Sequence, residues 1–436
     1  MRTRLERYFE FEKLGANWRT ETLAGFTTFM TMAYIVFVNP SILQEAGMPF
    51  GAVLAATCIS AAAGSLLMGA FARYPIALAP GMGLNAYFTY TVVQGMGVPW
   101  ETALGAVFLS GIAFLLLTAL GLRQLLVAAI PTQLYAAVAV GIGLFIALIG
   151  FKNAGIVVSH PATMVTLGDL RAPDTLLAVA GLLLMAALLA WGIRAAILLG
   201  ILATTALGAL AGLVQWQPGA AATLSAIDAT AFRLDIPGAL KLGLAEIIFV
   251  FLFVDLFDNI GTLVGVGKKA NLFDSASRIP RINRILFADA AATVTGSLAG
   301  TSTVVSYIES AAGVSAGGRT GIPAVVAGLL FLLVLFIAPV IGAIPAAATA
   351  PALILVGALM ISHAAEIDWT NPLTAVPSFL TITAIPLTFS IANGLAFGFT
   401  AYTLLHILRG QCRKISWLVY ALTALFVIRF YYLGAG

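Results

Sequence analysis

Long hydrophobic runs separated by short polar segments dominate the sequence. Before a polar stretch at 215–237, runs long enough to cross a membrane, whole or in broken form, lie at 22–44, 50–71, 76–96, 102–121, 125–149, 174–192 and 195–214. Seven more lie at 238–266, 285–299, 300–318, 322–341, 345–362, 373–389 and 391–408. About 20 apolar residues are enough for a helix to span a bilayer. The pattern therefore predicts an all-α polytopic membrane protein with 14 transmembrane segments.

A further apolar run, 415–433, follows a basic loop at 409–414. The run is long enough to cross the membrane as a fifteenth span. Arg429 and the terminal aromatic residues fit a helix lying at the membrane interface equally well. We favour the interfacial interpretation.

Composition and charge agree with a membrane protein. Of the 436 residues, 61% are hydrophobic and 9% are charged, whereas soluble domains carry about 25% charged residues. With the N-terminus inside, 17 Lys and Arg residues fall in predicted cytoplasmic segments, against four on the other side: Lys152, Arg171, Arg233 and Lys241. This asymmetry follows the positive-inside rule. We expect a bacterial inner-membrane protein in which both ends of the 14-span unit are cytoplasmic, and the basic balance does not indicate a nucleic-acid partner.

Seven spans on each side of the polar stretch suggest a duplicated unit. Because seven is odd, the second copy has the opposite orientation. Ala79-Pro80-Gly81 enters the third span where Ala299-Gly300-Thr301 enters the tenth, and counting onward places Tyr87 opposite Tyr307. Inverted repeats with matching interrupted segments are typical of secondary transporters, whose site lies near the midplane where those segments meet.

The tenth span contains a carboxylate in a weakly helical setting. Residues 300–321 are rich in Gly, Ser and Thr and carry Glu309. A charged group inside the bilayer is costly, and irregular backbone there is tolerated only where it faces protein or a water-filled cavity. Glu309 is therefore predicted to be a functional residue.

The eighth span presents a polar stripe. Asp255, Asp258, Asn259 and Thr262 fall at i, i+3, i+4 and i+7 of a helix. Two carboxylates one turn apart repel each other if both are ionised, which suits a carrier that binds and releases a proton. The alternative is that these groups hold neighbouring helices together by hydrogen bonds. Asp289, in the ninth span, is interpreted as an interface or capping residue.

Three segments carry a resemblance to a known family. They are APGMGLNAYF (79–88), FVDLFDNIGTLVGV (253–266) and GTSTVVSYIESAAGVSAGGRTG (300–321). The chain resembles, over essentially its whole length, the AzgA-like purine permeases, a branch of the nucleobase–cation symporters related to uracil and xanthine permeases. The resemblance implies a seven-plus-seven inverted repeat with short β-strands in the broken third and tenth segments.

The resemblance also implies a division into domains. Their expected bounds are a cytoplasmic N-terminus (1–21), a core domain of spans 1–4 and 8–11 (22–121 and 238–341), a gate domain of spans 5–7 and 12–14 (122–214 and 342–408), an extracytoplasmic connection (215–237) and a C-terminal basic loop with its helix (409–436).

By resemblance the protein is a transporter, not an enzyme, that imports guanine, hypoxanthine or adenine by proton symport in an alternating-access cycle. Asp255 and Glu309 would hold the polar edges of the base, with Asn85, the main chain at Ile308, and Tyr87 and Phe88 as further contacts. Asp258, Asn259 and Thr262 would support the site or the proton coupling. The proton is the coupling ion, no other cofactor or metal is expected, and the partners are the base, the lipid bilayer and, by resemblance, a second copy in a homodimer.

Three other classes of protein fit the sequence less well. An anion transporter of the sulfate or bicarbonate type shares the repeat plan, but three candidate carboxylates at the site would repel its substrate. An intramembrane enzyme would need a nucleophile, metal or acid–base pair, and the spans show no such spacing. A channel would not account for two broken segments in corresponding positions. The preferred purine and the carboxylate that carries the proton stay open.

Overall fold

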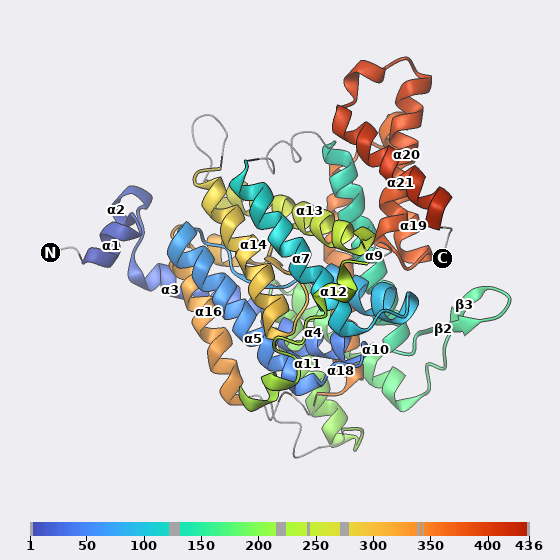
Figure 1. Ribbon diagram of the computed structural model, residues 1–436. Coiled ribbons are helices and arrows are strands. Elements are labelled where there is room, and N and C mark those ends of the chain that lie inside the picture. Colours follow the sequence, from blue (N-terminus) through green and yellow to red (C-terminus); the bar gives the residue numbers. More distant parts are fainter. Residues whose placement is uncertain are drawn as a thin grey trace.

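The computed structural model of the protein is built almost entirely of helices (Figure 1). It describes residues 3–121, 131–214, 224–241, 245–270, 279–337, 341 and 344–433. Parts of several predicted segments therefore lie outside the described residues. They are 122–130 and 342–343 in the gate domain, 215–223 in the connection 215–237, 242–244 and 338–340 in the eighth and eleventh spans, 271–278 in the loop before the ninth span, and 1–2 and 434–436 at the termini.

The first half of the chain contains seven segments in the predicted order. Two short helices precede them, α1 (Arg4–Tyr8) and α2 (Phe11–Leu14). The segments are α3 (Trp18–Met32) with α4 (Ile35–Gln44); α5 (Phe50–Leu66) with η1 (Leu67–Ala72); β1 (Leu78–Pro80) with α6 (Met82–Ala86) and η2 (Tyr87–Gly95); α7 (Trp100–Ala119); α9 (Thr132–Asn153); α10 (Pro173–Ala190); and α11 (Ala196–Leu210). A hairpin of β2 (Val157–His160) and β3 (Met164–Leu167) separates α9 from α10.

The second half repeats this order after η3 (Leu224–Ala229) and α12 (Ile236–Ala239). Its segments are α13 (Ala245–Ala270); α14 (Ile282–Ala299); β4 (Val304–Ser306) with α15 (Ser310–Ser315); α16 (Ile322–Val334) with η5 (Leu335–Ile337); α18 (Ala346–Met360) with η6 (Ile361–Glu366); α19 (Pro372–Leu387); and α20 (Ile391–Leu408). The chain then continues through η7 (Cys412–Lys414) into α21 (Trp417–Leu433).

Among the described residues, eight helical stretches are long and apolar enough to cross a membrane. They correspond to the first, second, fourth, fifth, sixth, eighth, twelfth and fourteenth predicted spans. Of the other six segments, α11, α16 and α19 are shorter apolar helices. The ninth, α14, includes Asn283, Arg284 and Asp289 and is less hydrophobic. The third and tenth are interrupted, as the sequence predicts.

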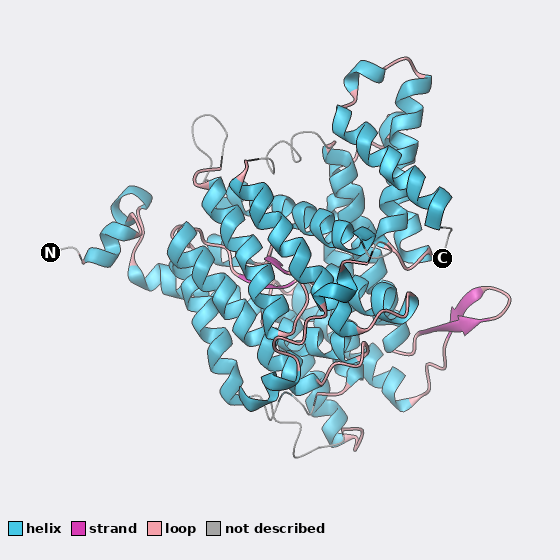
Figure 2. Cartoon of the chain, in the orientation of Figure 1, coloured by secondary structure: helices cyan, strands magenta, loops and turns pink. Residues whose placement is uncertain are grey.

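Two short strands lie inside the helical body, and a second pair projects from it (Figure 2). The inner pair is β1 and β4, antiparallel, with Ala79 opposite Val305. The two interrupted segments are therefore in direct contact through their main chains. The predicted correspondence of Tyr87 with Tyr307 in the two repeats stays a prediction.

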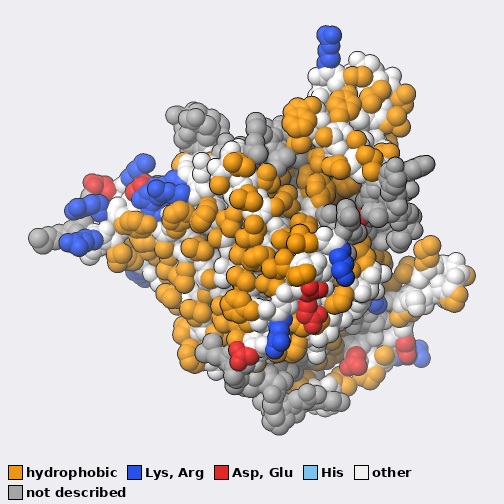
Figure 3. All heavy atoms as spheres, viewed as in Figure 1, with side chains coloured by type: hydrophobic (Ala, Val, Ile, Leu, Met, Phe, Trp, Pro, Cys, Tyr) orange, Lys and Arg blue, Asp and Glu red, His pale blue; other side chains and the backbone are white. Residues whose placement is uncertain are grey.

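One end of the bundle gathers segments predicted to be cytoplasmic. The Glu10 carboxylate forms ion pairs with Arg281, Arg73 and Lys13. Burial alone would raise the pKa of Glu10, but these three positive charges hold it below its usual value. The cluster joins the N-terminal segment to the loops that follow the second and eighth spans. Figure 3 shows charged side chains gathered over the N-terminal helices, while hydrophobic side chains cover much of the neighbouring surface.

The opposite end gathers segments predicted to be extracytoplasmic. Glu45, after the first span, accepts hydrogen bonds from the Tyr90 hydroxyl (2.8 Å) and the Asn153 amide (2.9 Å), which belong to the third and fifth spans. Asp235 accepts from Thr102 (2.8 Å). These contacts join ends of different segments to one another, and the side of the membrane on which each end lies stays a prediction.

The final helix, α21, packs against the bundle in the described residues. Its Phe426 ring lies 5.8 Å from Phe249 of α13 and 6.0 Å from Phe399 of α20, centroid to centroid. The Thr423 hydroxyl is 2.8 Å from that of Thr403 on α20. The interfacial placement of residues 415–433 stays a prediction.

Candidate functional site

The two interrupted segments cross at the β1–β4 pair. Main-chain hydrogen bonds extend the pairing at both ends, from Gly81 N–H to the Thr303 carbonyl (2.9 Å) and from Tyr307 N–H to the Ala77 carbonyl (3.0 Å). The Ser65 hydroxyl bonds the N–H and the carbonyl of Leu78. These contacts satisfy backbone groups that would otherwise be unpaired at membrane depth. The chain then enters a helix on each side, α6 after β1 and α15 after β4.

Glu309 stands at the start of α15 but does not cap it. Its Oε1 atom accepts a hydrogen bond from the Tyr34 hydroxyl at 2.6 Å. Its main-chain carbonyl accepts from the Thr31 hydroxyl at 3.4 Å. Tyr34 lies at the interruption between α3 and α4, so the first span is also broken at the level of the site. The carboxylate therefore faces the first span.

Carboxylates of the ninth and tenth segments act electrostatically on one of the eighth. The charges of Asp289 and Glu309 both act on Asp258 of α13. Asp289, on α14, is fully buried and accepts a hydrogen bond from the Ser306 hydroxyl of β4 (3.3 Å). This hydrogen bond joins the ninth segment to the tenth. The interpretation of Asp289 as an interface or capping residue stays a prediction.

Asp255 is directed to the strand pair. It is 2% exposed, and its Oδ2 atom accepts from the Thr293 hydroxyl of α14 at 3.3 Å. The same hydroxyl lies 3.0 Å from the Val304 carbonyl of β4. Glu309 instead bonds Tyr34 of the first span. The proposed pairing of Asp255 with Glu309 around one base stays a prediction.

Two buried amides stand out among the predicted site residues. Asn85 on α6 and Asn259 on α13 are 0% exposed. Within the described residues, neither side chain has a hydrogen-bond partner. An amide that is buried without a partner costs about 1–3 kcal/mol. Such groups are suited to bind a polar ligand. Thr262, on the same stripe as Asn259, is also buried.

The two aromatic side chains predicted to contact the base are buried against a neighbouring helix. Tyr87 and Phe88 are both 0% exposed, and their rings lie 5.3 and 6.4 Å from that of Phe251 on α13. Ile308 differs, because its side chain is 44% exposed. Its Cδ1 atom lies so close to Gly265 that an added Cβ there would be only 3.1 Å away. In this conformation Ile308, rather than either ring, is accessible.

Sequence reasoning missed Tyr34 and Thr293. Both lie in apolar runs and carry ordinary hydroxyl side chains, so nothing in the local pattern distinguishes them from packing residues. For Tyr34, no Gly or Pro at positions 33–34 marks the break in the first span.

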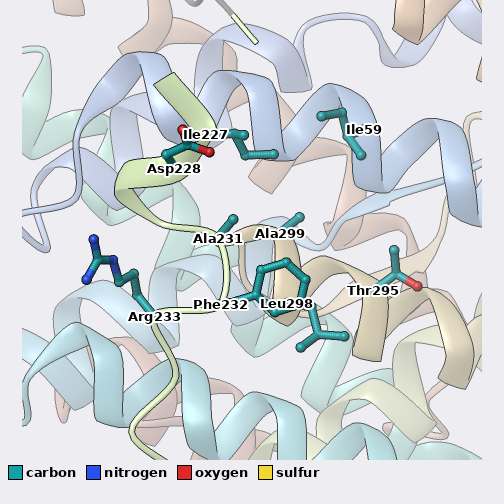
Figure 4. Close-up of a pocket in the computed structure, with 9 residues that line it drawn as sticks. All are labelled: Ile59, Ile227, Asp228, Ala231, Phe232, Arg233, Thr295, Leu298 and Ala299. Atoms are coloured by element: carbon teal, nitrogen blue, oxygen red, sulfur yellow. The ribbon is translucent and has the colours of Figure 1, made fainter. Parts of the chain in front are cut away.

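A surface groove of about 660 Å³ lies apart from these groups (Figure 4). It is lined by Ile59 of α5, by the end of α14 at Thr295, Leu298 and Ala299, and by η3 with the segment after it. None of the predicted site residues is among its lining. The described residues include no group of three or more His, Cys, Asp or Glu side chains that could hold a metal ion.

Comparison with known proteins decides the family. Residues 19–397 match the model of the Permease family, Xan_ur_permease. The chain belongs to this permease family. The adenine permease AdeP of Escherichia coli K12 is 46% identical to the permease, over 99% of this chain and 97% of that one. The guanine/hypoxanthine permease PbuG of Bacillus subtilis 168 is 41% identical, over 98% and 100%. The resemblance to AzgA-like purine permeases is thereby confirmed, and the permease is a transporter, not an enzyme.

A solved structure confirms the fold. The transmembrane domain of the cyanobacterial bicarbonate transporter BicA superposes with a TM-score of 0.63, covering 88% of the permease and 98% of that chain at 15% identity. The permease thus has the predicted fold of 14 segments in a seven-plus-seven inverted repeat, with short strands in the third and tenth. At this identity the likeness concerns the fold alone, and the family match argues against the anion-transporter alternative.

Proposed function

We propose that the permease imports purine bases, namely guanine, hypoxanthine or adenine, by proton symport. The observation that carries the proposal is that carboxylates lie beside the crossing of the two interrupted segments. Asp289 accepts a hydrogen bond from Ser306 of β4, Glu309 follows the same strand, and the charges of both act on Asp258. Purines present alternating N–H donors and acceptor atoms on a flat ring. Carboxylates can accept from the N–H groups, and the buried amides of Asn85 and Asn259 can both donate and accept.

Proton coupling has a physical basis in the same cluster. Mutual repulsion disfavours the ionisation of neighbouring carboxylates together, so the group favours uptake of a proton. A proton that enters with the base would neutralise part of this charge while the site changes its access. The three elements that carry the carboxylates all belong to the proposed core domain, so the site would move as one body.

Alternating access is supported by the contacts between the proposed domains. On the extracytoplasmic side, Asn153 of the gate is bonded to Glu45 of the core, and the Thr91 hydroxyl donates to the Phe389 carbonyl. Ile308 lies next to Gly265, toward the predicted cytoplasmic end of α13. We infer that these contacts close the outer side while the site faces the cytoplasm.

Uptake of radiolabelled bases tests the proposal. Cells without their own purine permeases should accumulate guanine, hypoxanthine or adenine when they express the protein, and a protonophore should abolish accumulation. Uracil serves as the control base. Uptake of none of these purines, or accumulation that is indifferent to the proton gradient, would overturn the proposal.

A variant separates binding from coupling. Asp258→Asn should retain exchange of labelled for unlabelled base across a vesicle membrane, which needs no net proton movement, and lose accumulation driven by a pH gradient. If Asp258→Asn accumulates base as the wild type does, Asp258 is not the coupling group.

A further inference from the structure

The hydroxyl of Tyr34 lies at the site, but Tyr34 was not among the predicted site residues. Tyr34 is 1% exposed and donates to Glu309 Oε1 at 2.6 Å, the short distance typical of a charge-assisted bond. The residue is held at the break between α3 and α4, where main-chain bonds of the i+3 type run from Val36 to Ala33 and from Phe37 to Tyr34. Tyr34 thus reaches Glu309 from a backbone position with little freedom.

This bond limits what Glu309 offers to a ligand. An ionised carboxylate has two oxygens and about four acceptor positions, and it pairs best with two parallel N–H donors when both oxygens are open. With Tyr34 on Oε1, one of the two carboxylate oxygens is already engaged. Glu309 then accepts hydrogen bonds from a ligand chiefly through Oε2. A single free oxygen suits one N–H donor better than two adjacent donors.

The purines differ in the N–H donors that they can present to Glu309. Hypoxanthine has a single N–H on its six-membered ring, at N1, and adenine presents an exocyclic amine beside an acceptor nitrogen. Guanine presents two adjacent donors, N1–H and the 2-amino group, which match a carboxylate with both oxygens open. We infer that Tyr34 is a specificity-determining residue that withholds from guanine the second hydrogen bond to Glu309. The inference rests on the proposed purine transport.

Removal of the hydroxyl should therefore change selectivity. The measurement is competition of unlabelled guanine against labelled hypoxanthine uptake in wild type and in Tyr34→Phe, giving the guanine Ki and the hypoxanthine KM. The ratio of the two should fall about tenfold in Tyr34→Phe, since one added charge-assisted hydrogen bond is worth a factor of that order. Tyr90→Phe is the matched control, because it removes another tyrosine–glutamate hydrogen bond outside the site. Its ratio should stay at the wild-type value.

Two results would overturn the inference. In one, Tyr34→Phe changes guanine and hypoxanthine by the same factor, or changes neither, so the hydroxyl does not discriminate between them. In the other, the wild type already binds guanine at least tenfold more tightly than hypoxanthine, so the second bond is not withheld. The wild-type comparison needs no variant, so it can overturn the inference even if Tyr34→Phe does not fold. If the wild type takes up no purine, the proposed function itself is wrong. Normal purine uptake with an unchanged ratio in Tyr34→Phe would overturn only the inference about Tyr34.

Discussion

At the scale of single residues, the site combines charge with buried polarity. Glu309 is bonded to Tyr34, Asp289 to Ser306 and Asp255 to Thr293. In each pair a carboxylate from one segment meets a hydroxyl from another. A hydroxyl partner holds a carboxylate in place and leaves its negative charge intact, whereas an arginine partner would neutralise that charge. The site therefore keeps its negative character available for a proton or for the N–H groups of a ligand.

Removal of the charge at Glu309 should abolish transport without unfolding the protein. In Glu309→Gln the amide oxygen can still accept from Tyr34, so the local structure is preserved while the ionisable group is lost. We expect purine uptake to fall at least tenfold at equal amounts of protein in the membrane, measured by initial rate and immunoblot. Asp255→Asn should have a similar effect.

Glu366→Gln is the control for this pair. Glu366 is exposed, at 61% of its side-chain surface, and pairs only locally with His363 in the described structure. Its uptake should match the wild type. Normal transport by both site variants would show that the carboxylates are misassigned, even though the family is established.

At the scale of elements, small residues let the interrupted segments approach their neighbours. Gly313 on α15 faces α3 so closely that an added Cβ would lie 2.1 Å from the Thr28 hydroxyl and 2.5 Å from the Ala24 carbonyl. Close approach through small residues is common between membrane helices. This contact sets the distance between α15, which begins after Glu309, and the helix pair that carries Tyr34.

Gly313→Ala should therefore push α15 away from α3. Overpacking of this kind costs about 1–3 kcal/mol, so the melting temperature in detergent should fall and transport should weaken with it. Gly261→Ala is the control on α13, since a Cβ there would meet nothing within 4 Å. A melting temperature in Gly313→Ala equal to that of Gly261→Ala would refute the proposed close contact.

The sequence predicted the regular elements better than the contacts between them. Hydrophobic runs and the positions of Lys and Arg predicted the 14 segments, because span length and topology depend on local composition. The strands at 78–80 and 304–306 came only from the family resemblance, since three-residue strands leave little local pattern. Contacts such as Tyr34 with Glu309, 275 positions apart, depend on the packing of whole spans. Neither residue type nor spacing reveals them.

At the scale of the whole molecule, the two ends of the bundle are closed by different means. The cluster around Glu10, at the predicted cytoplasmic end, joins the N-terminal segment to loops of the proposed core. The bond between Glu45 and Asn153, at the predicted extracytoplasmic end, instead joins proposed core to proposed gate. Of these two contacts, only the bond between Glu45 and Asn153 must break for the proposed domains to move apart.

Cysteine labelling can test this asymmetry. Ile308→Cys, made together with Cys412→Ser because Cys412 is the exposed native cysteine, should react with a membrane-impermeant maleimide from the cytoplasmic side. Addition of Asn153→Ala should loosen the outer contact and increase labelling from the extracytoplasmic side several-fold. Asn371→Ala, in the loop before α19 on the predicted cytoplasmic side, is the control. Labelling of Ile308→Cys from the extracytoplasmic side alone would contradict the proposed orientation of the closed state.

The pairing of β1 with β4 also constrains how the protein is made. Residues 78 and 304 are 226 positions apart, and ribosomes add about 5–20 residues per second. The first strand is thus complete roughly 11–45 s before its partner exists. Unpaired main-chain groups are poorly tolerated in the bilayer core. The first half of the chain therefore cannot reach its final structure alone. Until the second half is synthesised, the insertion machinery or protein already inserted must shield the third span from lipid.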